Sequence, residues 1–289
     1  MSDRARAARV IAKRQVFEAV VSPGLYVSLV VGLFLGYALV SSFARAVDSS
    51  GFNPQLNPLY DIVGRALEGA FGKTFVDGLF AEGPLPFAFW VSFVPVFLYI
   101  TVSSVFKFGL EKNAGAVELV AYGPADGTAY LVACSIKDLL LTLAAIVVEL
   151  LFLLVAAALY NYVAGPGLFV AALVAFFLSL ALSAYGSLAS MLTMNASSAL
   201  ALFLGIVAFF LVVLFGSFAI VGEYVRSLST VIAYAIQWIS PFYYGNLSLQ
   251  ASTAGSPLGV IGGLALLAVL AALVLTASHF IIRARGVRA

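Results

Sequence analysis

Histidine, cysteine and charged side chains are scarce in this chain of 289 residues, which has one histidine, one cysteine and only 10% charged residues. The lone Cys134 excludes an intrachain disulfide and a cysteine-rich metal site, so we interpret it as a small apolar side chain. We interpret His279, near the end of an apolar segment, as an interfacial residue. No spacing of carboxylates, histidines or cysteines indicates a metal or catalytic centre. The net charge of +2 is too small to indicate a nucleic-acid partner.

Apolar residues are abundant instead, at 63% of the chain, which is far above the average for soluble domains. Crossing roughly 30 Å of hydrocarbon takes about 20 residues of helix, and several apolar segments reach that length. The predicted spans cover residues 24–44, 86–106, 137–159, 168–190, 198–221 and 258–281. The sequence therefore predicts one all-α polytopic membrane domain over residues 1–289, embedded in the lipid bilayer of the cell membrane.

The N-terminal residues 1–19 are basic and precede the first span. Arg6, Arg9 and Lys13 fall on one face at helical spacing, which predicts an interfacial helix resting on anionic headgroups. A solvated tail that only sets orientation is the alternative. We expect the first span to stay uncleaved, because no small-residue cleavage site follows it. Within that span, Gly32 and Gly36 form a GxxxG pair that favours close approach of another helix.

The distribution of lysine and arginine sets the predicted orientation. With both termini cytoplasmic, eleven of these residues lie at or near the cytoplasmic surface and four lie outside. The segments 45–85 and 222–257 are then extracytoplasmic. We expect an amphipathic helix beginning at Pro58 in the first, and a broken or re-entrant helix before span six in the second.

The segment 107–130, between spans two and three, is the largest polar interruption on the cytoplasmic side. Residues 111–122 show helical spacing of Ala114, Val117 and Ala121, so Glu111 is predicted to open a short surface helix that ends before Pro124. Such a helix, fixed between two spans, is suited to transmit the motion of a docked partner. An ordinary intracellular loop is the alternative.

Glu149 lies in the middle of span three, where an ionised carboxylate is costly. It must be protonated, paired or turned toward a polar cavity. It is therefore a candidate for translocation, while a protonated glutamic acid bonded within the bundle is the structural alternative. No partner for it is identifiable from the sequence.

A nucleotide-binding loop is excluded by the residues around the GKT sequence at 72–74. The phosphate-binding pattern needs a glycine five residues before Gly72, and Leu67 stands there instead. The chain is therefore not expected to be an ATPase.

The segment between spans two and three resembles the first intracellular region of the type-2 (exporter) permeases of ATP-binding-cassette (ABC) transporters. That region reads glutamate, a basic residue, a glycine, then glutamate-leucine and a proline. The matching residues are Glu111, Lys112, Gly115, Glu118, Leu119 and Pro124. The sequence SPF at 240–242 is similar to one found before the last span of these permeases. At Gly127 and Cys134 the chain lacks the basic residues that members often carry.

The resemblance implies a dimer of permeases, identical or not, each docked on a cytoplasmic ABC ATPase subunit that carries ATP and magnesium. The implied contact with the ATPase is made by Glu111, Lys112, Asn113, Gly115, Glu118, Leu119, Tyr122 and Pro124. The implied path lies between protomers and is lined by spans one, two and five. Phenylalanines in spans two and five favour a hydrophobic or amphiphilic cargo.

Two other functions stay open at this point. One is an ion- or proton-coupled secondary transporter or channel that uses Glu149. The other is a permease-like scaffold that energises an extracytoplasmic accessory protein through the long outer segments.

Overall fold

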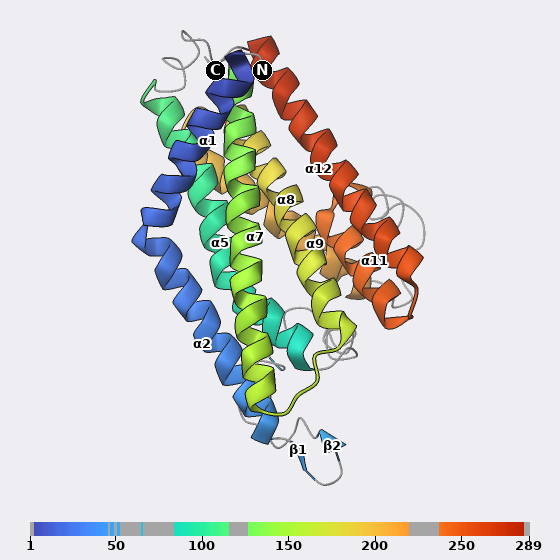
Figure 1. Ribbon diagram of the computed structural model, residues 1–289. Coiled ribbons are helices and arrows are strands. Elements are labelled where there is room, and N and C mark those ends of the chain that lie inside the picture. The colour runs from blue at the N-terminus through green and yellow to red at the C-terminus, as the bar shows by residue number, and fades with distance from the viewer. Residues whose placement is uncertain are drawn as a thin grey trace, which may run out of the picture.

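The computed structural model describes residues 3–45, 47–48, 51–52, 65, 84–115, 127–219 and 237–285. These residues form a bundle of helices and one small hairpin (Figure 1). The helices are α1 (Asp3–Val21), α2 (Pro23–Arg45), α5 (Pro84–Asn113), α7 (Gly127–Leu159), α8 (Pro166–Leu192), α9 (Ala196–Ala219), α11 (Pro241–Thr253) and α12 (Pro257–Arg285). The hairpin pairs β1 (Val47–Asp48) with β2 (Gly51–Phe52) in antiparallel register.

Five of these helices, α2, α5, α7, α8 and α12, are long and apolar enough to cross a membrane. This confirms the prediction of a helical, multi-pass membrane protein. Helix α7 has 33 residues and is therefore about 50 Å long, which exceeds the roughly 30 Å of hydrocarbon. One end of α7 must consequently extend beyond the bilayer, and α5, with 30 residues, shares this feature.

Proline and glycine mark the ends of the helices. Proline is the first residue of α2, α5, α8, α11 and α12, where its fixed φ suits the first turn and its missing N–H is not needed. Gly115 has φ of +71° and lies two residues beyond α5, and Gly255, with φ of +67°, lies two residues beyond α11. Glycine adopts this left-handed conformation without steric penalty, so both helices stop there.

Helix α8 lies in the middle of the bundle and packs against α5, α7, α9, α11 and α12. Helix α2 packs on α5 and α7, whereas α1 packs on α7. Figure 1 shows both chain termini at one end of the bundle, together with the end of α5 and the start of α7. The connection between α5 and α7 therefore leaves and returns at the end that carries the termini.

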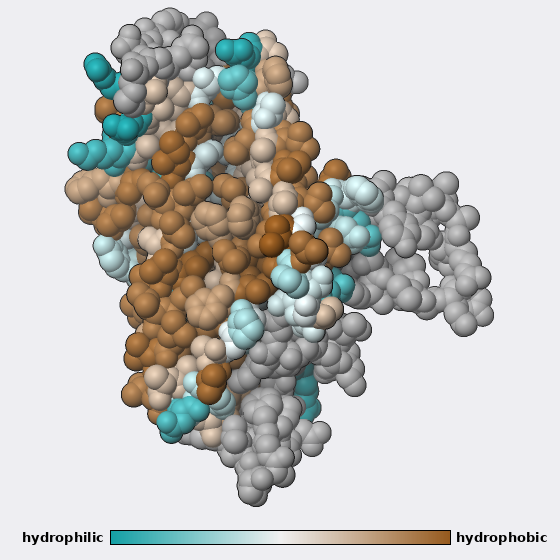
Figure 2. Space-filling view, turned by 45° about the vertical axis from the view of Figure 1, so that its right-hand side comes forward, coloured by the Kyte–Doolittle hydropathy of each residue, from teal (hydrophilic) through white to brown (hydrophobic). Residues whose placement is uncertain are grey.

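The surface is apolar over most of its height. Figure 2 shows hydrophobic side chains covering much of the side of the bundle, while hydrophilic ones lie at its two ends and along the right-hand side of the view. Large apolar side chains on α2 and α12, such as Phe34, Val30 and Leu273, are more than half exposed. This arrangement is the one expected for helices whose outer faces contact lipid.

Gly32 and Gly36 bring α2 into close contact with the two helices behind it. A Cβ built at Gly36 would lie 3.1 Å from Ser92 Cβ on α5 and 3.3 Å from Leu153 Cδ2 on α7. A Cβ at Gly32 would collide with the Ser92 carbonyl oxygen. The predicted close approach at the GxxxG pair is thus confirmed, and it joins α2, α5 and α7.

A glycine on α5 makes a testable contact with α9. A Cβ at Gly109 would lie 2.5 Å from Ala196 Cα, and this backbone atom cannot move aside as a side chain can. We expect Gly109→Ala to destabilise the protein by about 1–3 kcal/mol, because overpacking outweighs the gain in helix propensity. Unfolding in mixed detergent micelles measures this. The control is Gly205→Ala on α9, where an added Cβ meets nothing within 4 Å; equal stability of the two variants would contradict the prediction.

Candidate functional site

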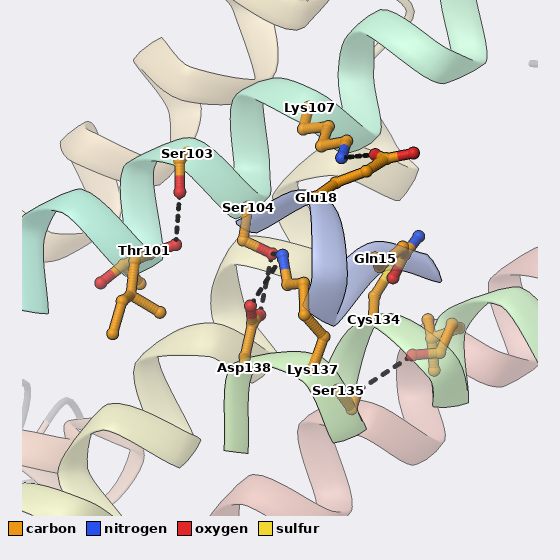
Figure 3. Close-up of polar contacts among 12 residues, drawn as sticks. Gln15, Glu18, Thr101, Ser103, Ser104, Lys107, Cys134, Ser135, Lys137 and Asp138 are labelled. Atoms are coloured by element: carbon orange, nitrogen blue, oxygen red, sulfur yellow. Dashed lines mark hydrogen bonds and ion pairs between the residues drawn. The ribbon is translucent and has the colours of Figure 1, made fainter. Parts of the chain in front are cut away.

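Helices α1, α5 and α7 are joined by polar side chains at the end of the bundle that carries the termini (Figure 3). We call this set the helix-end network. Its members are Arg14, Gln15, Glu18, Ser104, Lys107, Cys134, Lys137 and Asp138. It borders the connection between α5 and α7, which is the segment predicted to dock a partner.

A buried ion pair is the centre of this network. Lys137 Nζ lies 3.0 Å from Asp138 Oδ1, and the two side chains are only 7% and 5% exposed. Ser104 on α5 connects the pair to the neighbouring helix, because its hydroxyl accepts from Lys137 Nζ at 3.1 Å and donates to Asp138 Oδ2 at 2.8 Å. A buried pair of charges is tolerated only when such further hydrogen bonds satisfy it, so Ser104 is needed for the pair to persist.

Helix α1 is attached to the same region by an ion pair and a hydrogen bond. Glu18 accepts from Lys107 on α5 and from Arg14 Nε within α1, the latter at 2.7 Å. These two hydrogen bonds hold the pKa of Glu18 below its ordinary value of 4.5. Gln15 Nε2 donates to Cys134 Sγ on α7 at 3.4 Å. Cys134 is buried, as its interpretation as an apolar side chain predicted.

The basic residues predicted for the interfacial helix lie on the opposite side of α1. Arg6, Arg9 and Lys13 are exposed, whereas Ala8 and Ala12 are buried against the bundle. The cations therefore face outward at the end of the bundle, in the position that contact with anionic headgroups requires. The contact itself stays a prediction.

A small polar cavity adjoins the ion pair between α5, α7 and α8. Thr101, Ser104 and Asp138 line one side of it, and Ser183, Ser187 and Ser190 of α8 line the other. The α8 serines follow one another at intervals of one helical turn, so their hydroxyls share a face. Hydroxyl and carboxylate oxygens can hold water here. Across the described ranges, no group of three His, Cys, Asp or Glu side chains could hold a metal ion.

The residues predicted to contact an ATPase are described only in part. Glu111, Lys112 and Asn113 form the last turn of α5, so Glu111 does not open a separate helix as predicted. No proline or glycine lies between Gly109, which is within α5, and Gly115, whose φ of +71° follows the end of the helix. Lys112 Nζ donates to the Thr193 carbonyl oxygen at 2.8 Å, at the end of α8. The other predicted residues, Glu118, Leu119, Tyr122 and Pro124, lie outside the described residues.

Glu149 faces the interior of the bundle and is completely buried. Neither carboxyl oxygen has a hydrogen-bond partner among the described residues. The neighbouring Ser92 hydroxyl is close enough to interact with the Glu149 carboxyl. Its hydrogen bond goes to the Phe89 carbonyl oxygen at 3.0 Å. A Cβ at Gly32 would lie 2.6 Å from Glu149 Oε1. The sequence singled out Glu149 by its depth, but Ser92 and Gly32 are remote in sequence and gave no signal.

The SPF sequence at 240–242 begins helix α11, with Ser240 at the N-cap position and Pro241 at the first helical residue. Two tyrosine hydroxyls anchor the chain before it. Tyr185 Oη donates to the Ile239 carbonyl oxygen at 2.6 Å, and Tyr244 Oη donates to that of Trp238 at 2.7 Å. A separate short helix before the last span was predicted, and α11 fits that position. The predicted amphipathic helix from Pro58 lies outside the described residues.

Comparisons with protein-family models, with curated proteins and with solved structures find no match to this chain. The fold and composition define its class as a multi-pass helical membrane protein.

The buried ion pair leads to a prediction about stability. Lys137→Met and Asp138→Leu should each destabilise the protein by about 3–5 kcal/mol, because each leaves an uncompensated buried charge. The double variant should lose much less than the sum of the two, since it leaves neither charge behind. A double-mutant cycle in mixed detergent micelles measures the coupling. Additive losses would show that the two side chains do not interact.

The Glu18 carboxylate leads to a prediction about pH. Its pKa is lowered in the folded protein, so its stabilising effect is present above pH 4.5 and is lost as the pH falls through the folded-state pKa. The side chain is a third exposed, and we expect an effect of less than about 1 kcal/mol. The protection factors of the α1 amides, which correct the exchange rates for their intrinsic dependence on pH, should fall on acidification in the wild type. In Glu18→Gln these protection factors should already be low at pH 6 and should vary less with pH.

Proposed function

We propose that this chain is the permease subunit of an ATP-driven ABC transporter of the type-2 (exporter) family, which moves a hydrophobic or amphiphilic cargo. A separate cytoplasmic ATPase drives it through the segment 107–130. The observation that carries the proposal is the place of the motif beginning at Glu111. It begins in the last turn of α5 and continues into the connection to α7, and the helix-end network joins these two helices further along the bundle.

The network supports a mechanical role for this segment. Asp138 and Lys137 on α7 share Ser104 of α5, so displacement of one helix end carries the other with it. Separating them exposes or strands a buried charge, which is costly. Lys112 extends the connection to the end of α8. A force applied between α5 and α7 is therefore distributed over three helices.

The remaining parts of the proposal follow the arrangement of the helices. Helix α9, with 24 residues, is the sixth span. Both termini and the segment 107–130 are cytoplasmic, because the cations Arg6, Arg9 and Lys13 lie at this end and lysine and arginine favour the cytoplasmic side. A second permease protomer completes the path, and the segments 45–85 and 222–257 are extracytoplasmic, where an accessory protein can bind.

One observation favours a second candidate, an ion- or proton-coupled secondary transporter. Glu149 is completely buried and lacks a hydrogen-bond partner in the described part of the chain. Ionisable residues in that setting often belong to ion or proton pathways. Under this candidate, flux persists without ATP and stops in Glu149→Gln. Under the first, flux requires the ATPase.

The test is co-purification of the permease with the ATPase encoded beside it, followed by ATP hydrolysis and transport in vesicles. Glu118→Arg should reduce ATP-dependent transport at least about tenfold, since a reversed charge opposes the docked partner. The control is Gln250→Arg, an exposed residue of α11 at the other end of the bundle. The proposal would be overturned if no ATPase co-purifies with the chain and transport persists without ATP.

A further inference from the structure

We infer that the junction of α2, α5 and α7 around Glu149 is a binding site for a hydrophobic cation, such as a lipophilic amine or quaternary ammonium compound. The ligand of this site would be the cargo of the transporter, so the inference rests on the proposed function. Four observations carry it. They are the buried carboxyl group, the absence of charged residues from the spans around it, the helix that covers it, and the aromatic rings that belong to the same buried core.

The carboxyl group is fully buried, and both of its oxygens lack hydrogen-bond partners among the residues the structure describes. The Ser92 hydroxyl is close enough to interact with the carboxyl, but its hydrogen bond goes to the Phe89 carbonyl oxygen. A Cβ on Gly32 would collide with the Ser92 carbonyl oxygen and would lie 2.6 Å from Glu149 Oε1. The junction therefore contains more acceptor oxygens than donors, and a proton on Glu149 is the simplest way to satisfy it in this arrangement.

No protein cation in the surrounding spans can pair with Glu149. The segments 23–44 of α2, 85–106 of α5 and 166–192 of α8 contain no charged residue, and Glu149 is the only one in 139–159 of α7. The titratable groups within these segments of α2 and α5 are phenols: Tyr26, Tyr37 and Tyr99. The Lys137–Asp138 pair lies about 17 Å away along α7, and its two charges pair with each other. Within the described spans around it, an ionised Glu149 therefore has no cation, and a ligand can supply one.

Helix α2 is the cover of this site and is itself a peripheral helix. Its inner face reaches the carboxyl only because residue 32 is a glycine. Its outer face is open, with Val30 and Phe34 exposed at 63% and 69%. One helix therefore separates the carboxyl from the lipid side of the bundle. Movement of α2 away from α5 and α7 would admit a ligand from the bilayer, where hydrophobic cations accumulate.

Aromatic rings on α5 favour a cation over an anion of the same shape. Phe89 and Phe93 are stacked with ring centroids 5.7 Å apart, and Phe97 continues the row at 6.1 Å from Phe93. The faces of such rings carry negative potential and attract cations. Binding is an exchange, in which the ligand cation takes the place of the proton on Glu149 and the proton leaves to water. Affinity should consequently rise with pH.

Tetraphenylphosphonium and tetraphenylborate, which share size and shape but differ in charge, are the probes for this site. The permease in lipid nanodiscs should bind the phosphonium above the level of empty nanodiscs, more tightly at pH 8 than at pH 6. Glu149→Gln should weaken this binding at least about tenfold and remove its pH dependence, while leaving borate binding unchanged. The control Asp3→Asn removes a carboxylate at the start of α1, outside the helix-end network, and should bind like the wild type.

Wild-type protein provides a second measurement that does not depend on the folding of a variant. A hydrophobic carbodiimide should modify Glu149, as located by mass spectrometry, and the phosphonium but not the borate should protect it. Phosphonium binding that survives in Glu149→Gln overturns the inference. The inference is also overturned if the carbodiimide modifies Glu149 while the phosphonium neither binds nor protects it, because Glu149 then binds only a proton. Glu118→Arg should retain phosphonium binding, so failure of the ATPase coupling and failure of the cation site are distinguishable.

Discussion

The absence of water from the bilayer core is the constraint that organises this protein. Each backbone group must be bonded within its helix, and each charge must find a partner or be neutralised. The chain meets this with long apolar helices and places half of its charged residues in α1 and in the segment 107–138. Glu149 departs from the pattern, because it lies among segments without any other charge. Such a departure is stabilising only if a proton or a ligand completes it.

The helix-end network shows how the same constraint creates mechanical connection. A buried ion pair contributes little net stability, but it is expensive to break. Lys137 and Asp138 both lie on α7, and Ser104 of α5 bonds to each of them, so parting the two helices breaks two hydrogen bonds to buried charges. Helix α1 adds a weaker, partly exposed contact through Glu18, which salt and acid can release. The end of the bundle thus contains a strong inner connection and a labile outer one.

Sequence reasoning predicted where several helices begin, because apolar run length and proline placement are local signals. The starts of α2, α8 and α12 lie within about two residues of prediction for that reason, whereas α7 begins at Gly127, ahead of the predicted residue 137. Partners were not predictable: Ser104 precedes Asp138 by 34 residues, and Gln15 precedes Cys134 by 119. The burial of Lys137 and Asp138 therefore had no signal in the sequence. Glu111 was assigned to a new helix, since the continuation of α5 beyond the hydrocarbon has no apolar signature.

Helix α7 connects the two polar regions. It carries Asp138 in the helix-end network and Glu149 about 17 Å further along, within one uninterrupted helix. A tilt imposed at its Gly127 end, next to the segment 107–130, is therefore transmitted to the carboxyl without a hinge. At Gly32 the fit against α2 leaves no room for adjustment, since even a methyl group would collide there. A small rotation of α7 is thus sufficient to open or close the contact that covers Glu149.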